Sequence, residues 1–259
     1  MTLDVNADWW KTLFDDVYLQ TDARSVCDEE LTRREVDVIC ELLPFRPPDR
    51  ILDLCGGQGR HSLELSARGF AHCTVVDYSP HLIEVGETRA RTLGHAVRFV
   101  RAGARSTGLP AAHFHHVMIL GNSLGYLADE NGDALILAEA RRVLRPGGRL
   151  LMDVADGGLA TGGLNPNAWH EIGEDLVICR QREIGDGRIR TRELVLSKER
   201  GLVRDNAYAI RLYDEAALLD RVSGAGFTDP VVHRDFSPHG KEGDYGFMNR
   251  RILVTARKP

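Results

Sequence analysis

Between residues 50 and 154, short apolar runs alternate with stretches of helical periodicity. The apolar runs are bounded by Pro and Gly, so we expect buried strands at residues 50–54, 73–76, 97–100, 117–120 and 149–154. We expect helices at residues 59–68, 80–93 and 134–144. Strands that are apolar throughout and separated by helices are typical of parallel βα units. The alternation therefore predicts a doubly wound, mostly parallel α/β sheet of Rossmann-like type.

The pattern changes after Asp156. Residues 157–168 are rich in Gly, Asn and Pro and predict a loop, and strand-like stretches follow at 176–184, 188–198 and 202–212. The segment Gly185-Asp186-Gly187 is a hairpin signal between the first two. We interpret residues 157–213 as an antiparallel β insertion. A helix at 214–225, a strand at 231–233, a polar loop at 237–246 and a strand at 251–256 should then complete a seven-stranded sheet with one antiparallel member.

Ahead of the sheet, apolar side chains recur at helical spacing in residues 7–20 and 28–43. We expect residues 1–48 to form an N-terminal helical unit. Residues 49–156 and 214–259 would then form the sheet domain, with the insertion over one end of it.

The first strand leads into a glycine-rich turn, Ile51-Leu-Asp-Leu-Cys-Gly-Gly-Gln-Gly-Arg-His61. Glycines let the backbone pass close to a ligand, and the helix that follows presents free N–H groups to it. This turn alone is compatible with a dinucleotide site, a phosphate site or a plain tight turn.

The second strand ends in an acid, Asp77, which is followed by Tyr78 and Ser79. A carboxylate at this place can accept hydrogen bonds from both hydroxyls of a ribose, which indicates an adenosine-like ligand. The alternative is that Asp77 caps the helix that begins after it.

Residues 51–154 resemble the class I S-adenosylmethionine (SAM)-dependent methyltransferases. The resemblance is carried, in order, by Asp53, Gly57 and Gly59, by Asp77, by the strand at 117–120 and by Leu144-Arg-Pro-Gly-Gly148. It implies SAM as the cofactor. The organisation is similar to that of small-molecule enzymes such as the glycine and sarcosine N-methyltransferases.

The resemblance also implies roles for single residues at the cofactor. Cys55, Gly57 and Gly59 would lie beside the methionine portion, Asp53 near the amino group, and Asp77 at the ribose. Tyr78 and Ser79 would flank the adenine, which the backbone of Ala104 and Arg105 would contact, because Gly103 stands where the family often has an acid. Cys55 replaces a motif glycine, so we expect its backbone to avoid conformations that only glycine tolerates.

Two further segments would contact the cofactor. The resemblance implies that Tyr18, from an N-terminal lid, touches the methionine end. Asn122 and Ser123, after the fourth strand, would face the sulfonium, although a capped turn explains them equally well.

The insertion follows the fifth strand, at the carboxyl end of the sheet where ligands bind, so it should cover the acceptor. Candidate acceptor contacts are Tyr126, Trp169, Arg180, Arg182, Arg211 and Tyr213, with Arg192 and Tyr208 as further lining candidates. Arg180 and Arg182 share a strand face and could clamp a carboxylate. Candidates for a catalytic role are His170, Asp156 and Asn122; His116 and His239 are other possible bases, and the sequence does not choose among them.

Charge and composition restrict the partners. The net charge is −5, without a basic stripe, and the Asn/Asp-Pro-Pro-aromatic motif of DNA adenine methyltransferases is absent, so we expect a small-molecule acceptor and no nucleic acid. The chain has five cysteines but no CxxC pair, which favours the cytoplasm and argues against a metal site. We expect no membrane span and a monomer or homodimer.

Two other functions remain open at this point. SAM itself could be the substrate of a cyclase or lyase on the same fold, or the chain could bind SAM without catalysis.

Overall fold

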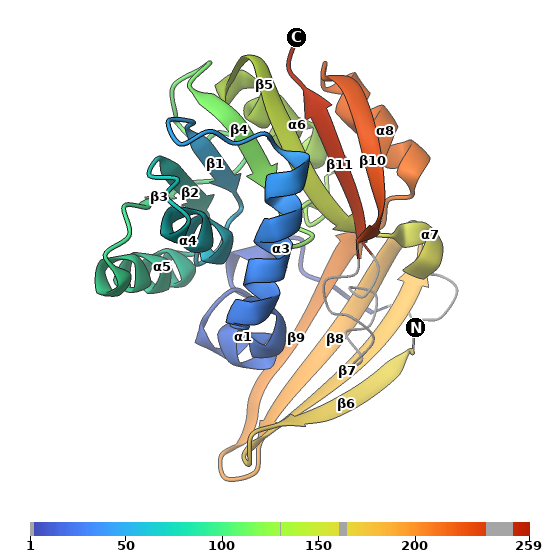
Figure 1. The fold of residues 1–259 in the computed structure, drawn as a ribbon. Helices are drawn as coiled ribbons and strands as arrows, with labels where there is room; N and C mark the ends of the chain where they lie inside the picture. Colours follow the sequence, from blue (N-terminus) through green and yellow to red (C-terminus); the bar gives the residue numbers. More distant parts are fainter. Residues whose placement is uncertain (1–2, 130, 161–164, 237–250) are drawn as a thin grey trace.

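The protein, here a computed structural model that describes residues 3–129, 131–160, 165–236 and 251–259, contains two β-sheets (Figure 1). The larger is seven-stranded, with the order β10-β11-β5-β4-β1-β2-β3, and the smaller is four-stranded, with the order β6-β7-β8-β9. The predicted doubly wound sheet and the inserted antiparallel sheet are confirmed.

The centre of the large sheet is parallel. Its strands are β1 (Ile51–Leu54), β2 (Cys73–Asp77), β3 (Arg98–Arg101), β4 (Phe114–Ile119) and β5 (Leu144–Ala155). β11 (Arg251–Arg257) runs antiparallel to both β5 and β10 (Thr228–Phe236). It is therefore the single antiparallel member that the sequence predicts. The carboxyl ends of the parallel strands lie at one edge of the sheet, where the chain departs into its loops.

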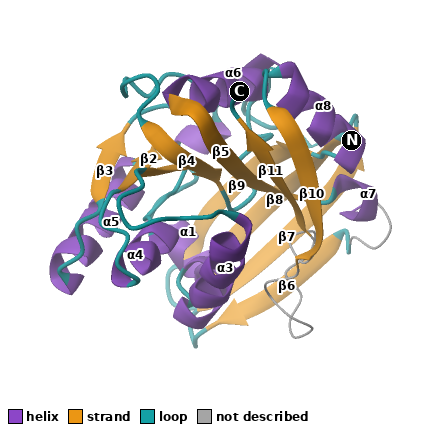
Figure 2. Cartoon of the chain, turned by 45° about the horizontal axis from the view of Figure 1, so that its top comes forward, coloured by secondary structure: helices purple, strands orange, loops and turns teal. Residues whose placement is uncertain are grey.

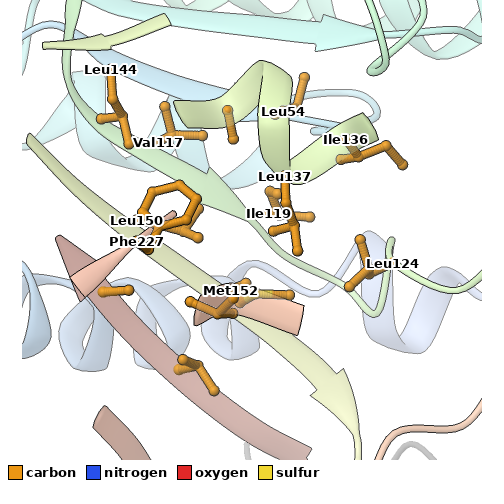
Figure 3. Close-up of a cluster of buried hydrophobic side chains, with 14 of the residues drawn as sticks. Leu54, Val117, Ile119, Leu124, Ile136, Leu137, Leu144, Leu150, Met152 and Phe227 are labelled. Carbon is orange, nitrogen blue, oxygen red and sulfur yellow. The ribbon is translucent and has the colours of Figure 1, made fainter. Parts of the chain in front are cut away.

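Helices cover both faces of this sheet (Figure 2). One face carries α3 (Glu29–Leu42), α4 (Arg60–Ala67) and α5 (Pro80–Leu93), and the other carries α6 (Asn131–Val143) and α8 (Glu215–Gly224). Figure 3 shows the core on the α6 side, where Leu137, Ile119 and Met152 belong to one cluster of buried side chains. Each fully buried aliphatic side chain contributes about 1.5–3 kcal/mol to folding, so this core fixes the site at its edge.

The smaller sheet, named here the cover sheet, consists of β6 (Asn167–Ile172), β7 (Leu176–Gly185), β8 (Arg188–Ser197) and β9 (Gly201–Arg211). Three of its strands match the expected stretches. β6 falls partly in the expected loop and is missing from the prediction, as is the short helix α7 (Gly157–Ala160). β6 is an edge strand whose exposed and half-buried residues alternate, so it lacks the apolar run that reveals a buried strand.

The N-terminal segment, residues 3–27, is not the single helix expected at 7–20. It forms a 3-10 turn at Trp9–Lys11, α1 (Asp16–Thr21) and α2 (Ala23–Val26). The break follows from Asp15, which is extended and whose side chain accepts a hydrogen bond from the Tyr18 backbone N–H, so the helix starts again at that cap. The helix expected at 28–43 is confirmed as α3, which Asp28 caps.

Within these ranges the structure contains no helix that is both long and apolar enough to cross a membrane.

Candidate active site

A cavity of about 330 Å³ lies at the carboxyl ends of β1, β2 and β4. The glycine turn after β1 and the starts of α4 and α5 form its floor. The N-terminal segment and the inner face of the cover sheet form its roof. Elements that are far apart in the sequence therefore enclose one site, in the position where open α/β sheets bind ligands.

The glycine turn is shaped by contacts that exclude side chains. A Cβ on Gly56 would come within 2.6 Å of the Asp53 Cγ, and Gly57 adopts a φ of 57°. Cys55 adopts a φ of 62°, so the expectation that its backbone avoids the left-handed region is wrong. A non-glycine residue in that region costs roughly 1–2 kcal/mol, which the surrounding structure must offset.

Gly59 differs from the other predicted cofactor residues because it is absent from the cavity lining. It caps α4 with a φ of 72°, and a Cβ there would lie 2.8 Å from the Phe99 ring and 2.9 Å from Val75. Its position lets α4 pack closely against β2 and β3. The structure thus gives Gly59 a packing role in place of the predicted cofactor contact.

Asp77 joins two walls of the cavity. Its Oδ2 accepts a hydrogen bond from the Gly57 N–H at 2.8 Å, and its Oδ1 accepts one from the Ser79 N–H at 2.8 Å. Burial raises the pKa of Asp77, against the lowering effect of those two N–H groups. Each oxygen keeps a lone pair for a ligand. The carboxylate therefore suits a diol that lies between the glycine turn and α5.

Several buried polar atoms on the cavity wall have no hydrogen-bond partner among the described residues. Those beside the glycine turn and the loop after β4 are the Asp53 Oδ1, the Gln58 Oε1 and the Asn122 Nδ2. Such atoms are costly unless a ligand or water completes them. Two acceptors beside the glycine turn fit an ammonium group, so the residues present fit the methionine end of SAM.

In both Asp53 and Asn122, the other polar atom of the side chain accepts a hydrogen bond that fixes the residue in place. The Asp53 Oδ2 accepts a hydrogen bond from the Ser62 hydroxyl at 3.1 Å, and the Asn122 Oδ1 accepts one from the Ala155 N–H at 2.8 Å. Burial raises the pKa of Asp53 despite the opposing effect of His61. Asn122 has a φ of 59°, and it ties the loop after β4 to the end of β5. Both of the predicted roles that we weighed for Asn122, a turn and a site wall, are compatible with this geometry.

A buried charge network supports the floor of the cavity. Glu35 on α3 pairs with Arg60 and lies 2.9 Å from the His61 Nε2 and 3.7 Å from Arg251. Burial by itself would raise the pKa of Glu35, but these cationic and hydrogen-bonding neighbours lower it well below its ordinary value. Arg251 also pairs with Asp153, and burial lowers the pKa of Arg251 to about 10. α3, α4, β5 and β11 are thereby fixed to one another beneath the site.

Aromatic side chains attach the N-terminal segment to the cavity roof. Trp9 packs on Tyr126 at 5.0 Å and on Tyr208 at 5.5 Å between ring centroids, and Trp10 meets Tyr78 edge-on at 4.9 Å. The Ser79 hydroxyl donates a 2.6 Å hydrogen bond to the Phe14 carbonyl and also caps α5. Ser79 lines the cavity and thus connects the N-terminal segment to the cavity floor.

The remaining predicted cofactor residues lie on the cavity wall, namely Tyr18, Ala104, Arg105 and Ser123. The loop that carries Ala104 and Arg105 is anchored by Glu139 on α6, which accepts a 2.8 Å hydrogen bond from the Thr107 N–H.

On the cover-sheet side, Arg180 does not stand free as a clamp for a substrate carboxylate. Its Nε donates to Glu193 at 2.6 Å, and a terminal nitrogen pairs with Asp22 at 3.2 Å. These two acids occupy the guanidinium, which corrects the prediction for Arg180. Arg182 and Tyr126, two further candidates for acceptor contacts, also line the cavity.

Other predicted acceptor residues lie elsewhere. Trp169 is 70% exposed, because on β6 it points to the outer face of the cover sheet. Arg211 and Tyr213 both bind Asp133, a fully buried carboxylate that also accepts a hydrogen bond from the Gly125 N–H. The two residues hold the loop after β4 in place and do not line the cavity.

None of the predicted histidine or Asp156 bases reaches the described part of the cavity wall. His170 is half-buried on β6 beside Arg24 and Arg180, and burial lowers its pKa. Asp156 accepts a hydrogen bond from the Gly158 N–H in the turn that begins the insertion, and His116 binds Asp49 at 3.1 Å below the sheet. His239 lies outside the described residues.

The sequence reasoning missed several wall residues. They are Trp9, Trp10, Phe14, Asp22, Glu35, Gln58, Arg60, His61, Glu193 and Arg251. Gln58, Arg60 and His61 stand within or beside the glycine motif, which was a usable signal. The others come from distant elements, and the sequence does not show that they face the cavity.

Comparison with known proteins is consistent with this geometry. Residues 51–148 match the methyltransferase domain family. This match, together with the fold and the cavity, identifies residues 51–148 as a methyltransferase domain, in a fold similar to that of the SAM-dependent methyltransferases.

Individual relatives are similar over different lengths. The chain is 27% identical to 27-O-demethylrifamycin SV methyltransferase from Amycolatopsis mediterranei, over 92% of this chain and 88% of that protein. It is 34% identical to demethylmenaquinone methyltransferase from Thermus thermophilus, over 46% of this chain and 51% of that protein. Among solved structures, SAM-bound CalS10, an amino pentose methyltransferase from Micromonospora echinaspora, superposes with a TM-score of 0.67 at 18% identity, covering 96% of this chain and 99% of that one.

Proposed function

We propose that the cavity binds SAM along the glycine turn and transfers its methyl group to a small acceptor held under the cover sheet. The single observation that carries this proposal is the position of Asp77. Its two oxygens bind the glycine turn and the start of α5 from the wall of the cavity. A ribose diol bound there would place the two ends of the ligand in opposite directions along the floor.

In this proposal, different residues of the cavity contact different parts of the cofactor. Asp77 holds the ribose, Asp53 and Gln58 accept hydrogen bonds from the ammonium group, and the walls around Tyr78 and Ala104 enclose the adenine. SAM supplies a methyl group that its sulfonium has already activated, so this chain contributes mainly orientation and exclusion of water. Tyr18 and Tyr126 would close the site over the reacting centre.

The names of the relatives suggest the kind of acceptor. They act on a demethylrifamycin, a demethylmenaquinone and an amino pentose, all products of biosynthesis. We propose that this chain also methylates a biosynthetic intermediate. We further propose that it acts in the cytoplasm as a monomer or homodimer; all five cysteines are free, which fits a reducing compartment.

Mass spectrometry of reactions with SAM tests the function. We expect S-adenosylhomocysteine to form only when an extract of small metabolites is added, together with a product that is one methyl group heavier. Methylthioadenosine formed without any acceptor would instead indicate that SAM is the substrate of a cyclase or lyase. Absence of turnover with intact SAM binding would indicate a noncatalytic binding protein. Light scattering gives the oligomeric state.

A further inference from the structure

The loop after β3, residues 102–105, forms the wall of the cavity beside Asp77. Asp77 pairs with Arg101 in the parallel strands β2 and β3, and the Ala102 N–H donates a 3.0 Å hydrogen bond to the Asp77 carbonyl. In the proposed function Asp77 holds the ribose, and the glycine turn takes the methionine end of SAM. The purine ring must then lie beyond the ribose, against residues 102–105.

No side chain in this part of the wall accepts a hydrogen bond. Ala102, Gly103 and Ala104 have no polar side-chain atom, and the guanidinium of Arg105 only donates. The Gly103 carbonyl already accepts a hydrogen bond from the Ser106 N–H at 3.1 Å. The carboxylates that line the described part of the cavity all belong to other elements, namely Asp22, Glu35, Asp53, Asp77 and Glu193. The 6-amino group of adenine, which has two N–H donors, therefore meets no side-chain acceptor in this loop.

The wall is also open at Gly103. A Cβ at this position would meet no described atom within 4 Å apart from its chain neighbours. Arg101 and Arg105, on either side of Gly103, are exposed to solvent. A substituent on the 6-amino group consequently has room at this end of the cavity, and an unsubstituted amino group there keeps its contact with water.

The chemistry of the wall decides which purine rings it can distinguish. A site that is built to hydrogen-bond an N–H group rejects analogues that lack this group, because its own polar atoms are then left without partners. Ala102 and Ala104 pack against the apolar core and present no such atom. Apolar contact with the ring does not depend on the hydrogens of the 6-amino group, so this wall cannot reject a substituted ring on that ground.

We propose, on the basis of the proposed function, that the cofactor site does not recognise the 6-amino group and also binds adenosyl cofactors that carry a substituent on this nitrogen. Gly103 is the specificity-determining residue. An acid at this position would place an acceptor beside the amino group and would make the site select the unsubstituted adenine. With glycine, the site accepts a wider class of purine cofactors.

Calorimetry with the wild type tests the ligand class. The ligands are S-adenosylhomocysteine and its analogues with a 6-dimethylamino or a 6-benzylamino group. We expect both analogues to bind with a Kd within about threefold of that of S-adenosylhomocysteine. A larger loss with either analogue would overturn this proposal and leave the methyltransferase function intact. Absence of binding by S-adenosylhomocysteine itself would overturn both.

The variant Gly103→Asp tests the residue, with Gly103→Ala as its control. Both substitutions fit the open space at Gly103, but only the first adds an acceptor. We expect Gly103→Asp to bind S-adenosylhomocysteine at least about tenfold more tightly than the 6-dimethylamino analogue, whereas Gly103→Ala keeps the ratio of the wild type. The same ratio in both variants would show that position 103 does not face the 6-amino group, and would overturn its proposed role.

Discussion

At the scale of single residues, the sequence motif reveals some of the residues that shape the glycine turn, and the structure reveals others. The motif identifies Asp53, Gly57 and Asp77 because the residues follow strand ends that the sequence reveals. It does not identify Gly56, although a Cβ there would come within 2.6 Å of the Asp53 side chain. The requirement for glycine at this place follows from a contact between backbone and side chain inside the turn.

This contact gives the first prediction. Gly56→Ala forces either Asp53 or the turn to move, so we expect a loss of about 1–3 kcal/mol in the free energy of unfolding. The Kd for SAM should rise at least about tenfold, which corresponds to roughly 1.4 kcal/mol. Urea unfolding and calorimetry measure the two effects.

Gly224→Ala is the matched control, because a Cβ there meets nothing within 4 Å. The control should change neither quantity by more than about 0.5 kcal/mol. If Gly56→Ala behaves like Gly224→Ala, the close packing of Asp53 against the turn does not constrain the site.

Residues on the acceptor side could not be found in the same way. Asp22, Glu193 and Tyr208 come from α1–α2, β8 and β9, and the sequence does not show which residues of a strand face the cavity. The register does: Arg180 pairs with Glu193, and Thr191 pairs with Arg182 and Tyr208, which puts these side chains on the inner face. The sequence suggested histidines as bases because a histidine is a plausible base wherever it occurs, even when the direction of its side chain is not known.

At the scale of elements, the N-terminal segment is held to the rest of the molecule by a few specific contacts. Its own helices are too short to be stable alone. Ser79 holds it through the Phe14 carbonyl, and Arg204 pairs with Asp15. The sequence predicted an apolar helix here because aromatic residues recur at helical spacing. The structure instead bends the chain at Asp15, so that the same aromatics cover the cavity.

Ser79→Ala tests this attachment. It removes the bond to Phe14 and the cap of α5, so the free energy of unfolding should fall by about 1 kcal/mol. Hydrogen exchange of residues 9–15 should accelerate at least about fivefold relative to the core strands, because the segment opens locally.

The control for Ser79→Ala is Asp28→Ala, which removes the cap of α3 but leaves the bond between Ser79 and the N-terminal segment intact. It should cost a similar free energy without accelerating exchange in residues 9–15. Equal acceleration in both variants would mean that general destabilisation, and not the bond to Phe14, governs the segment.

At the scale of the whole molecule, buried carboxylates connect layers of the fold and make its stability depend on pH. Glu139 on α6 accepts hydrogen bonds from Arg142 and from Thr107 in the loop beside the cavity. The Arg142 hydrogen bonds, against the effect of burial and with help from Thr107, lower the pKa of Glu139 from 4.5 to about 2. A group with a lowered folded-state pKa stabilises the protein above its ordinary pKa and loses that contribution as the pH falls.

We therefore expect the free energy of unfolding to decrease between about pH 4.5 and pH 2, and Glu139→Gln to make this decrease shallower. At pH 7 the same variant should be less stable by about 2 kcal/mol, because charge-assisted hydrogen bonds are lost. Glu41→Gln, an exposed substitution on α3, is the control and should leave the slope unchanged. An identical pH dependence of Glu139→Gln and wild type, measured by urea unfolding, would contradict the role assigned to Glu139.

The central claim, that Asp77 holds the ribose of SAM, is tested most directly by a calorimetric cycle. S-adenosylhomocysteine and its 2′-deoxy analogue are each titrated into the wild type and into Asp77→Asn. The account predicts that loss of the 2′-hydroxyl weakens binding to the wild type at least about tenfold but has little effect in the variant, a coupling of roughly 1.4 kcal/mol. Equal losses in both proteins, with no coupling, would show that Asp77 does not touch the sugar.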